Sequence, residues 1–361
     1  MEKNKITVTN YSSNKSKYSY SSTTESFLDA FMGQKIVKPI VNFLPYGLPA
    51  NIITIISTSL VLFSFLIALQ CQNDNYTLWF LIPVFVCIYL IGDCVDGEQA
   101  RRTKTGSPLG EFLDHFLDTF VSGQLMISLL VVYNVNRPTL IYTVLCIGYI
   151  TQSIAFWERY QTGHMFFGKF GSTESILTLT LILTLGGFEK IRNFAALKLS
   201  EIDFFKTHLS QKLSFISGFS IIEIVFIILV ICAIGNIIWT IFRAKRISIR
   251  FFLFMLFIGF VTFEMIHIND RLDCFSLFII ALYAIGYVQS LLYAIVSKKK
   301  DPVPDFLFPA ALLVLYFMNV QIPNLSKILF VYVSVEVVIK ASIFIYKNRK
   351  YWVWRNPKVE A

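Results

Sequence analysis

Ten apolar runs follow residue 50, and they constrain the fold of this 361-residue chain more than any other feature. A run of about 20 apolar residues can cross the ~30 Å hydrocarbon layer of a bilayer as a helix. The mean hydropathy of +0.62 and the 55% hydrophobic content are typical of multi-span membrane proteins. We therefore predict an all-α integral membrane protein with about ten transmembrane helices. The runs cover residues 51–70, 77–95, 112–134, 139–157, 174–188, 219–242, 251–268, 275–296, 305–320 and 325–346.

Basic residues gather on one side of this ten-helix arrangement. Arg101, Arg102 and Lys104 lie in the loop after the second run, and residues 298–300 form a lysine run after the eighth. Cytosolic loops are enriched in Lys and Arg, so these loops and, for an even number of helices, both chain ends are predicted to be cytosolic. The net charge of +9 then reflects membrane topology, and we expect no nucleic acid among the partners. The membrane would be the endoplasmic reticulum or Golgi in a eukaryote and the inner membrane in a bacterium.

The two ends of the chain differ in composition from the apolar runs. Residues 1–22 are rich in Ser, Lys, Asn and Tyr, and we expect a flexible cytosolic tail there. Over residues 23–46, apolar side chains such as Phe27 and Phe31 recur at helical spacing among charged ones. This pattern predicts an amphipathic helix that lies in the membrane interface. A second cytosolic tail is expected at residues 347–361.

One polar motif interrupts the apolar pattern, at the end of the second run and the start of the third. An unpaired aspartate at bilayer depth costs about 3 kcal/mol, so four aspartates in one segment predict bound cations. The motif reads DxxDGxxARx8Gx3Dx3D, and its residues are Asp93, Asp96, Gly97, Ala100, Arg101, Gly110, Asp114 and Asp118.

The spacing of this motif brings its carboxylates together. Asp114 and Asp118 are four residues apart and share one face of a helix. Asp93 and Asp96 lie at the end of the preceding helix, where they can face the first pair across a pocket. Four convergent carboxylates suit hard cations such as Mg²⁺, and two such ions can clamp both sides of a phosphoryl displacement.

Other residues of the segment also suit phosphoryl transfer. Gly97 and Gly110 leave room for phosphates, and Arg101 can neutralise a phosphate oxygen. His115 is offset from Asp114 by roughly 100° around the helix, so we expect it to reach a substrate hydroxyl rather than the metal ions. An imidazole that titrates near neutrality is suited to act there as a general base.

Residues 92–119, with the sequence GDCVDGEQARRTKTGSPLGEFLDHFLDT, resemble the signature of the CDP-alcohol phosphatidyltransferase superfamily. Within it, DGxQARR followed by SPLGExxDHxxD is similar to the choline/ethanolamine phosphotransferase branch. Flanking segments are similar to that branch too: LPANIIT at residues 48–54, and the WxxYxTG and TE elements at residues 157–163 and 173–174. Ala50 stands where the branch has a proline.

The resemblance implies a fold and a reaction. Branch members have ten spans, which corresponds to a six-helix catalytic core at residues 47–242 and a four-helix C-terminal extension at residues 243–346. They transfer the phosphoaminoalcohol group of CDP-ethanolamine or CDP-choline to diacylglycerol, which gives phosphatidylethanolamine or phosphatidylcholine and CMP. Two Mg²⁺ or Mn²⁺ ions are the expected cofactors. Diacylglycerol is expected to enter the protein laterally from the membrane lipids, between two helices. A homodimer is usual in the superfamily.

The resemblance also implies roles for single residues. His115 falls on the base that the branch is proposed to use, and Asp118 is the alternative base. Tyr160 and Glu174 belong to the flanking elements and are further candidates. The matching metal ligands are Asp93, Asp96, Asp114 and Asp118, and the matching CDP-alcohol-binding positions are Asn51, Gly97, Ala100, Arg101, Gly110 and Glu111.

Two other functions are compatible with parts of the sequence. A CDP-diacylglycerol-dependent phosphatidyltransferase that acts on a small alcohol would share the motif, but such enzymes are usually shorter and differ at the position of His115. A polytopic transporter could use the carboxylates as a cation path, but it would scatter charged residues through several spans. Here the acidic residues concentrate in one loop and helix, which favours catalysis.

Overall fold

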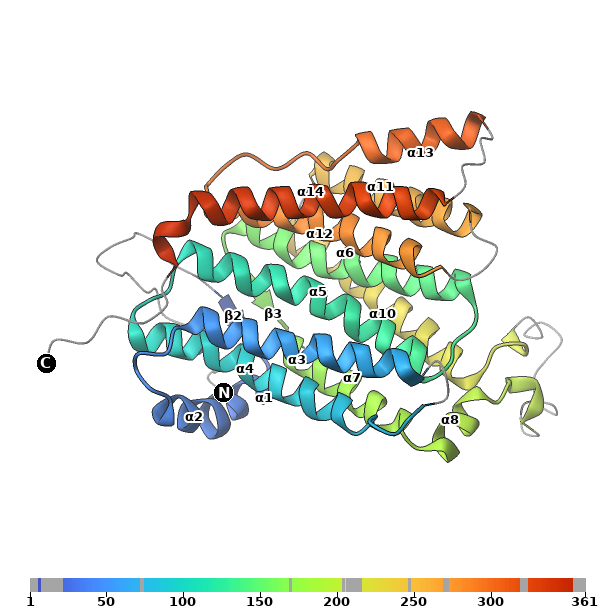
Figure 1. Ribbon diagram of the computed structural model, residues 1–361, viewed down its shortest axis with the longest axis horizontal. Coiled ribbons are helices and arrows are strands. Elements are labelled where there is room, and N and C mark those ends of the chain that lie inside the picture. The colour runs from blue at the N-terminus through green and yellow to red at the C-terminus, as the bar shows by residue number, and fades with distance from the viewer. Residues whose placement is uncertain are drawn as a thin grey trace, which may run out of the picture.

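Long helices aligned in one direction make up most of the molecule (Figure 1). The computed structural model describes residues 6–7, 22–71, 75–168, 171–202, 205, 216–245, 248–268, 273–318 and 324–352. The expected tails, 1–22 and 347–361, lie largely outside these described residues. The elements are β1 (Ile6–Thr7), β2 (Ser22–Thr24), α1 (Phe27–Met32), η1 (Gly33–Val37), α2 (Lys38–Phe43), α3 (Ala50–Gln70), α4 (Leu81–Thr103), α5 (Pro108–Val132), α6 (Pro138–Thr162), β3 (Met165–Phe167), α7 (Ser172–Gly186), α8 (Glu189–Ala196), η3 (Leu199–Glu201), α10 (Ile221–Ala244), α11 (Ile249–Ile268), α12 (Cys274–Val296), α13 (Leu307–Met318), α14 (Leu325–Lys347) and η5 (Arg349–Tyr351).

Each of the ten apolar runs coincides with a helix, from α3 to α7 and from α10 to α14. Among the described residues, seven helices are long and apolar enough to cross a membrane, namely α3, α5, α6, α10, α11, α12 and α14. The last turns of α4 carry the charges of the motif, and α7 and α13 have only 15 and 12 residues. The prediction of an all-α, multi-pass membrane protein is confirmed, and the crossing by all ten helices stays a prediction.

Proline and polar caps set where the paired helices α6 and α10 begin and end. Pro138 occupies the first turn of α6, where its missing N–H costs nothing, and Gly163 ends the helix with a φ of 72° that glycine adopts without strain. Ser220 and Glu223 form a capping box at the start of α10. These two helices pack along each other.

The core lies around α12, which packs against α5, α6, α11 and α14. The α5–α6 contact is equally close: a Cβ added at Gly123 would lie only 1.9 Å from the Tyr149 hydroxyl. In contrast, α10 and α14 expose large apolar side chains such as Ile231 and Ile339. These outward faces suit contact with lipid.

The predicted amphipathic helix is present as the continuous turns of α1, η1 and α2. Val37 and Val41 are buried against Val95 of α4, whereas Phe27 and Phe43 are exposed. One face is therefore packed and another presents aromatic side chains, as expected of an interfacial helix. The sequence did not predict the small sheet in which β2 pairs with β1 antiparallel and with β3 in parallel.

Candidate active site

The site is built where α4 ends and α5 begins. Lys104 adopts a left-handed conformation (φ 57°) at the end of α4, and the Ser107 side chain caps α5 by accepting a hydrogen bond from the Gly110 N–H (3.1 Å). α3 packs against both helices. This reversal brings the four motif aspartates within electrostatic range of one another.

A cavity of about 1430 Å³ opens beside these carboxylates. Asp93, Asp114 and Asp118 line it, and residues of α1 and η1, among them Asp29 and Gln34, border it on the side of the amphipathic helix. The N-terminal helical segment therefore contributes to the walls of the cavity, and its position in the membrane interface stays a prediction.

Two of the carboxylates are oriented by hydroxyl groups from neighbouring helices. The Tyr89 hydroxyl donates a hydrogen bond to Oδ1 of Asp118 (2.7 Å). The Thr54 hydroxyl of α3 donates to Oδ2 of Asp96, which is buried. Sequence reasoning did not identify Tyr89, because its signal, a tyrosine one turn before Asp93, is common in apolar helices.

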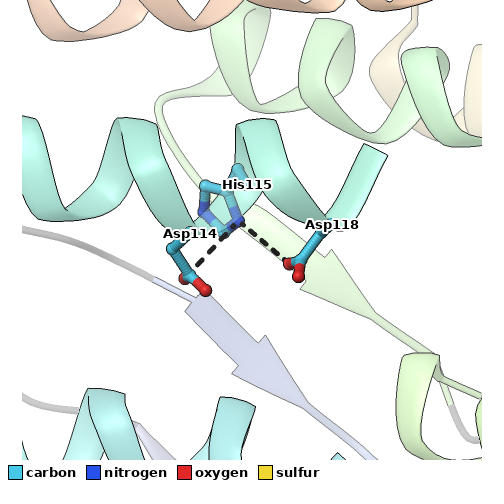
Figure 2. A group of neighbouring side chains, drawn as sticks. All are labelled: Asp114, His115 and Asp118. Carbon is cyan, nitrogen blue, oxygen red and sulfur yellow. Dashed lines mark ion pairs between the residues drawn. The ribbon is translucent and has the colours of Figure 1, made fainter. Parts of the chain in front are cut away.

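His115 faces the carboxylates more closely than the sequence predicted. Its Nδ1 atom lies 3.8 Å from Oδ2 of Asp114 and 4.0 Å from Oδ2 of Asp118, and Figure 2 shows the ring turned toward both. The imidazole therefore lies nearer to the two carboxylates than its offset around the helix suggests, and its reach to a substrate hydroxyl rather than to the metal ions stays a prediction. The 100° offset around the helix fixes only the direction of the Cβ atom, and the rotamer decides where the imidazole lies. In this rotamer the imidazole packs against Phe156, with ring centroids 5.3 Å apart.

The charge balance of this group suits a divalent cation. Asp114, His115 and Asp118 each offer a ligand atom within 4.8 Å of the others. Oδ1 of Asp114 is buried and has no hydrogen-bond partner among the described residues. Arg101, the basic residue of the motif, is ion-paired with Glu98 (2.7 Å). Buried oxygen ligands with uncompensated charge are what Mg²⁺ and Mn²⁺ bind, so these residues fit the predicted metal.

The residues expected to bind the CDP-alcohol have different surroundings. Arg101 lines the cavity. A Cβ added at Gly110 would lie 3.1 Å from Oδ1 of Asn51, so this glycine allows α3 and α5 to approach. Glu111 is buried in an ion pair with Arg159 of α6. The other expected residues are not among those that line the cavity, namely Asn51, Gly97, Ala100, Gly110 and Glu111.

Tyr160 and Glu174, the two further candidates, make structural contacts. The Tyr160 hydroxyl donates to the backbone carbonyl of Lys299 (3.1 Å). Glu174 accepts hydrogen bonds from the Gly171 N–H (2.8 Å) and from the Ser26 hydroxyl. It thereby caps α7 and ties it to the start of α1. Neither side chain lines the cavity.

The cavity continues away from the carboxylates as an arm with apolar walls. Leu125 and Leu129 of α5, Ile147 of α6, and Phe226 and Leu229 of α10 line it. From Asp118 to Leu129 the arm follows α5 for about 16 Å, at a rise of 1.5 Å per residue. This is roughly half of the ~30 Å hydrocarbon layer, a depth that suits acyl chains of one leaflet.

A buried ion pair borders the cavity at the ends of α6 and α10. Nε and Nη2 of Arg243 donate to the two carboxylate oxygens of Glu158 (2.5 and 2.6 Å), and the guanidinium lies 4.2 Å from the centroid of the Phe166 ring. All three side chains line the cavity. Sequence reasoning missed this pair because 85 residues separate its members and Arg243 has the position of an ordinary cytosolic anchor.

Comparison with known proteins points to one family. Residues 48–200 match the family model named CDP-alcohol phosphatidyltransferase. The chain is similar to human ethanolaminephosphotransferase 1 (26% identity over 181 residues, 46% of this chain and 45% of the relative). It is also similar to human cholinephosphotransferase 1 (28% over 156 residues, 41% and 38%) and to a CDP-alcohol phosphatidyltransferase class-I family protein of Dictyostelium discoideum (32% over 167 residues, 44% and 43%). The matched part of the chain spans less than half the length of each relative.

Proposed function

Since residues 48–200 match the CDP-alcohol phosphatidyltransferase family model, we propose that this multi-pass membrane protein transfers phosphoethanolamine or phosphocholine from the CDP-alcohol to diacylglycerol. The diacylglycerol hydroxyl oxygen forms a bond to the phosphorus that carries the aminoalcohol. The bond from that phosphorus to the CMP oxygen breaks, and CMP leaves with the electron pair. The proton of the hydroxyl passes to a base on the protein.

One observation carries the proposal: a single cavity joins the motif carboxylates to the apolar arm. A phosphotransferase with a soluble donor and a lipid acceptor needs both environments at one reacting centre. A cation path needs no apolar arm of this depth. The acyl chains of a CDP-diacylglycerol donor would also occupy such an arm, and the similarity to ethanolaminephosphotransferase 1 and cholinephosphotransferase 1 favours the soluble donor over it.

The metal ligands in this proposal are the four motif aspartates, Asp93, Asp96, Asp114 and Asp118. A divalent cation bound there supplies positive charge for the diphosphate oxygens and the leaving CMP. Two Mg²⁺ or Mn²⁺ ions match the number of carboxylates. Because these hard ions prefer oxygen to imidazole, His115 remains available for proton transfer.

His115 is the proposed base. Its Nδ1 faces two carboxylates, which favour the tautomer that carries the proton on Nδ1. Nε2 then accepts the proton of the diacylglycerol hydroxyl. Asp118 is the alternative base, but it already accepts a hydrogen bond from Tyr89, which weakens it as a proton acceptor.

The experiment compares the unaltered protein with Asp114→Asn. Purified protein receives diacylglycerol, Mg²⁺ and either CDP-ethanolamine or CDP-choline, and CMP release is measured. We expect release with at least one donor, at a rate that identifies the preferred aminoalcohol. We expect none from Asp114→Asn, because one lost carboxylate weakens metal binding and phosphate alignment.

Asp273→Asn is the matched control, since Asp273 caps α12 at the opposite end of the bundle and asparagine caps equally well. This variant should retain full activity. Near-native activity of Asp114→Asn at saturating Mg²⁺ would contradict the metal assignment, and no CMP release from the unaltered protein would contradict the proposed reaction.

The proposal also includes a cytosolic active site and a homodimer. The basic residues Arg101, Arg102 and Lys104 beside the motif support the cytosolic face, where soluble CDP-alcohols are available. The homodimer rests on the family resemblance. Light scattering of the protein in detergent measures its mass, and a single 41.4 kDa chain per micelle would exclude the dimer.

A further inference from the structure

Arg243 presents part of its guanidinium to the cavity in a restrained orientation. Glu158 holds Nε and Nη2 from one side, and the Phe166 ring covers one face of the guanidinium. Glu158 is almost fully buried, with 4% of its side chain exposed, whereas 28% of Arg243 is exposed. The pair is thus rigid on the protein side and open on the cavity side.

Hydrogen-bond donors of Arg243 remain for a ligand. A guanidinium has five N–H groups, and the carboxylate of Glu158 engages Nε and Nη2. The hydrogen bonds of Arg243 within the described part of the chain are those from Nε and Nη2, which leaves both N–H groups of Nη1 and one of Nη2. Three N–H groups are therefore left, and the two on Nη1 can donate to a ligand while Arg243 keeps its ion pair.

The charge of this pair favours a neutral ligand oxygen over a phosphate. Glu158 neutralises Arg243, and its carboxylate would lie close to any anion that Nη1 binds. The ester carbonyl of a glycerolipid is uncharged and accepts hydrogen bonds from such a donor. Arg101, at the nucleotide side of the cavity, is the basic residue better placed for the diphosphate.

The position of Arg243 agrees with an ester ligand. On α10, Asn236, Trp239 and Thr240 line the cavity next to Arg243, and the apolar arm with Val230, Leu229 and Phe226 begins about 20 Å further along the helix. Glu158 follows Phe156 by two residues in α6, and Phe156 packs on His115. Two residues correspond to a rise of about 3 Å along α6, and Phe156, Glu158 and Arg243 line the same cavity as His115. In diacylglycerol, an ester carbonyl is similarly close to the reacting hydroxyl.

We propose that Arg243, oriented by Glu158 and Phe166, binds the ester carbonyl of diacylglycerol next to the reacting hydroxyl and so selects acyl over alkyl glycerolipids. This inference rests on the proposed function and adds a specificity-determining residue to it. Arg243 lies beyond residues 48–200, the part that matches the family model.

The experiment uses two acceptors of equal chain length, a 1,2-diacylglycerol and the 1,2-dialkylglycerol in which ether linkages replace both esters. CMP release gives kcat and KM for each acceptor and for the CDP-alcohol. For the unaltered protein, the KM of the diacyl acceptor should be roughly tenfold lower than that of the dialkyl acceptor. A tenfold difference corresponds to the loss of one hydrogen bond from a charged donor. In Arg243→Gln this ratio should fall toward one, because only the diacyl KM rises, while the KM of the CDP-alcohol stays constant.

Two further variants separate substrate binding from folding. Glu158→Gln combined with Arg243→Gln leaves no unpaired buried charge and should lose the same selectivity. Arg137→Gln breaks a comparable Arg–Glu pair at the other ends of α6 and α10 and should keep the tenfold ratio.

The alternative outcomes are distinct. A ratio that stays near tenfold in both Arg243 variants would overturn the inference, and a raised KM for the CDP-alcohol would assign Arg243 to the phosphates instead. No CMP release from the unaltered protein with either acceptor would overturn the proposed function and this inference with it.

Discussion

The two ends of the α6–α10 helix pair are tied by the same combination of residues in opposite order. At the active-site end, Arg243 of α10 pairs with Glu158 of α6 and lies over Phe166. At the far end, Arg137 before α6 pairs with Glu223 of α10 (2.9 Å) and lies 4.3 Å from the Phe219 ring centroid.

The surroundings of the two pairs differ. Arg137 is 41% exposed and also donates to the backbone carbonyl of Gly218 (3.3 Å), and neither it nor Glu223 lines the cavity. Arg243 and Glu158 line the cavity. A shared contact pattern therefore clamps the two helices at both ends, and it can also serve substrate binding at the active-site end, because that end borders the described cavity.

The largest expected contrast between the two ends is their side of the membrane. In a background without the six native cysteines, Thr105→Cys at the active-site end and Lys350→Cys after α14 should react with a membrane-impermeant thiol reagent from the same side. Asn136→Cys at the far end should react only from the other side. Labelling of positions 105 and 350 from opposite sides would show that an odd number of spans separates them.

A large catalytic contrast is expected along α5. His115→Ala should lower turnover by roughly 10² to 10⁴, the usual effect of removing a general base, with little change in CDP-alcohol affinity. Tyr133→Phe, at the far end, removes the hydrogen bond to the Ile182 carbonyl (2.8 Å) and should leave turnover unchanged. If His115→Ala instead weakens nucleotide binding while turnover at saturating substrate stays normal, Asp118 is the base.

The third contrast concerns stability without substrate. Arg243→Ala leaves the buried Glu158 carboxylate unpaired and should lower the free energy of unfolding by about 3–5 kcal/mol. Arg137→Ala removes a side chain that is 41% exposed, and Glu223 keeps its hydrogen bond from the Ser220 N–H. The free energy of unfolding should therefore fall by about 1 kcal/mol or less. Thermal unfolding in detergent, followed by tryptophan fluorescence, measures both. Equal losses would mean that burial does not distinguish the pairs.

The smallest contrast concerns the two aromatic rings. Phe166→Leu and Phe219→Leu each remove a cation–π contact worth about 0.5–1 kcal/mol. Only Phe166→Leu should also raise the KM for diacylglycerol, by no more than about fivefold, because its ring helps to orient Arg243. An equal rise in both variants would indicate a general effect on packing.

Local patterns predicted the helices well. The lengths of the apolar runs predicted the positions of α3 to α7 and α10 to α14. The helical spacing of apolar residues among charged ones predicted the helical segment within residues 23–46. The spacing of Asp114 and Asp118 gave a shared helix face. These features depend on neighbours within a few residues, so a single sequence contains them.

Contacts between distant segments could not be predicted in the same way. The hydrogen bonds that orient Asp96 and Asp118 come from the hydroxyl groups of Thr54 and Tyr89. The orientation of His115 depends on Phe156 of another helix. Tyr160 matches a family element, yet its hydroxyl bonds to Lys299, 139 residues away. Sequence spacing within one helix carries no information about such pairings.

The sequence by itself determined the solvent of this protein and the chemistry of its centre. Apolar runs of membrane-spanning length require helices in a bilayer, and four aspartates within residues 93–118 predict a bound cation. Only the tertiary structure decided that this centre opens into an apolar arm and that Arg243 borders it. A cavity is the space between helices, and its walls depend on how several helices pack, which no local pattern encodes.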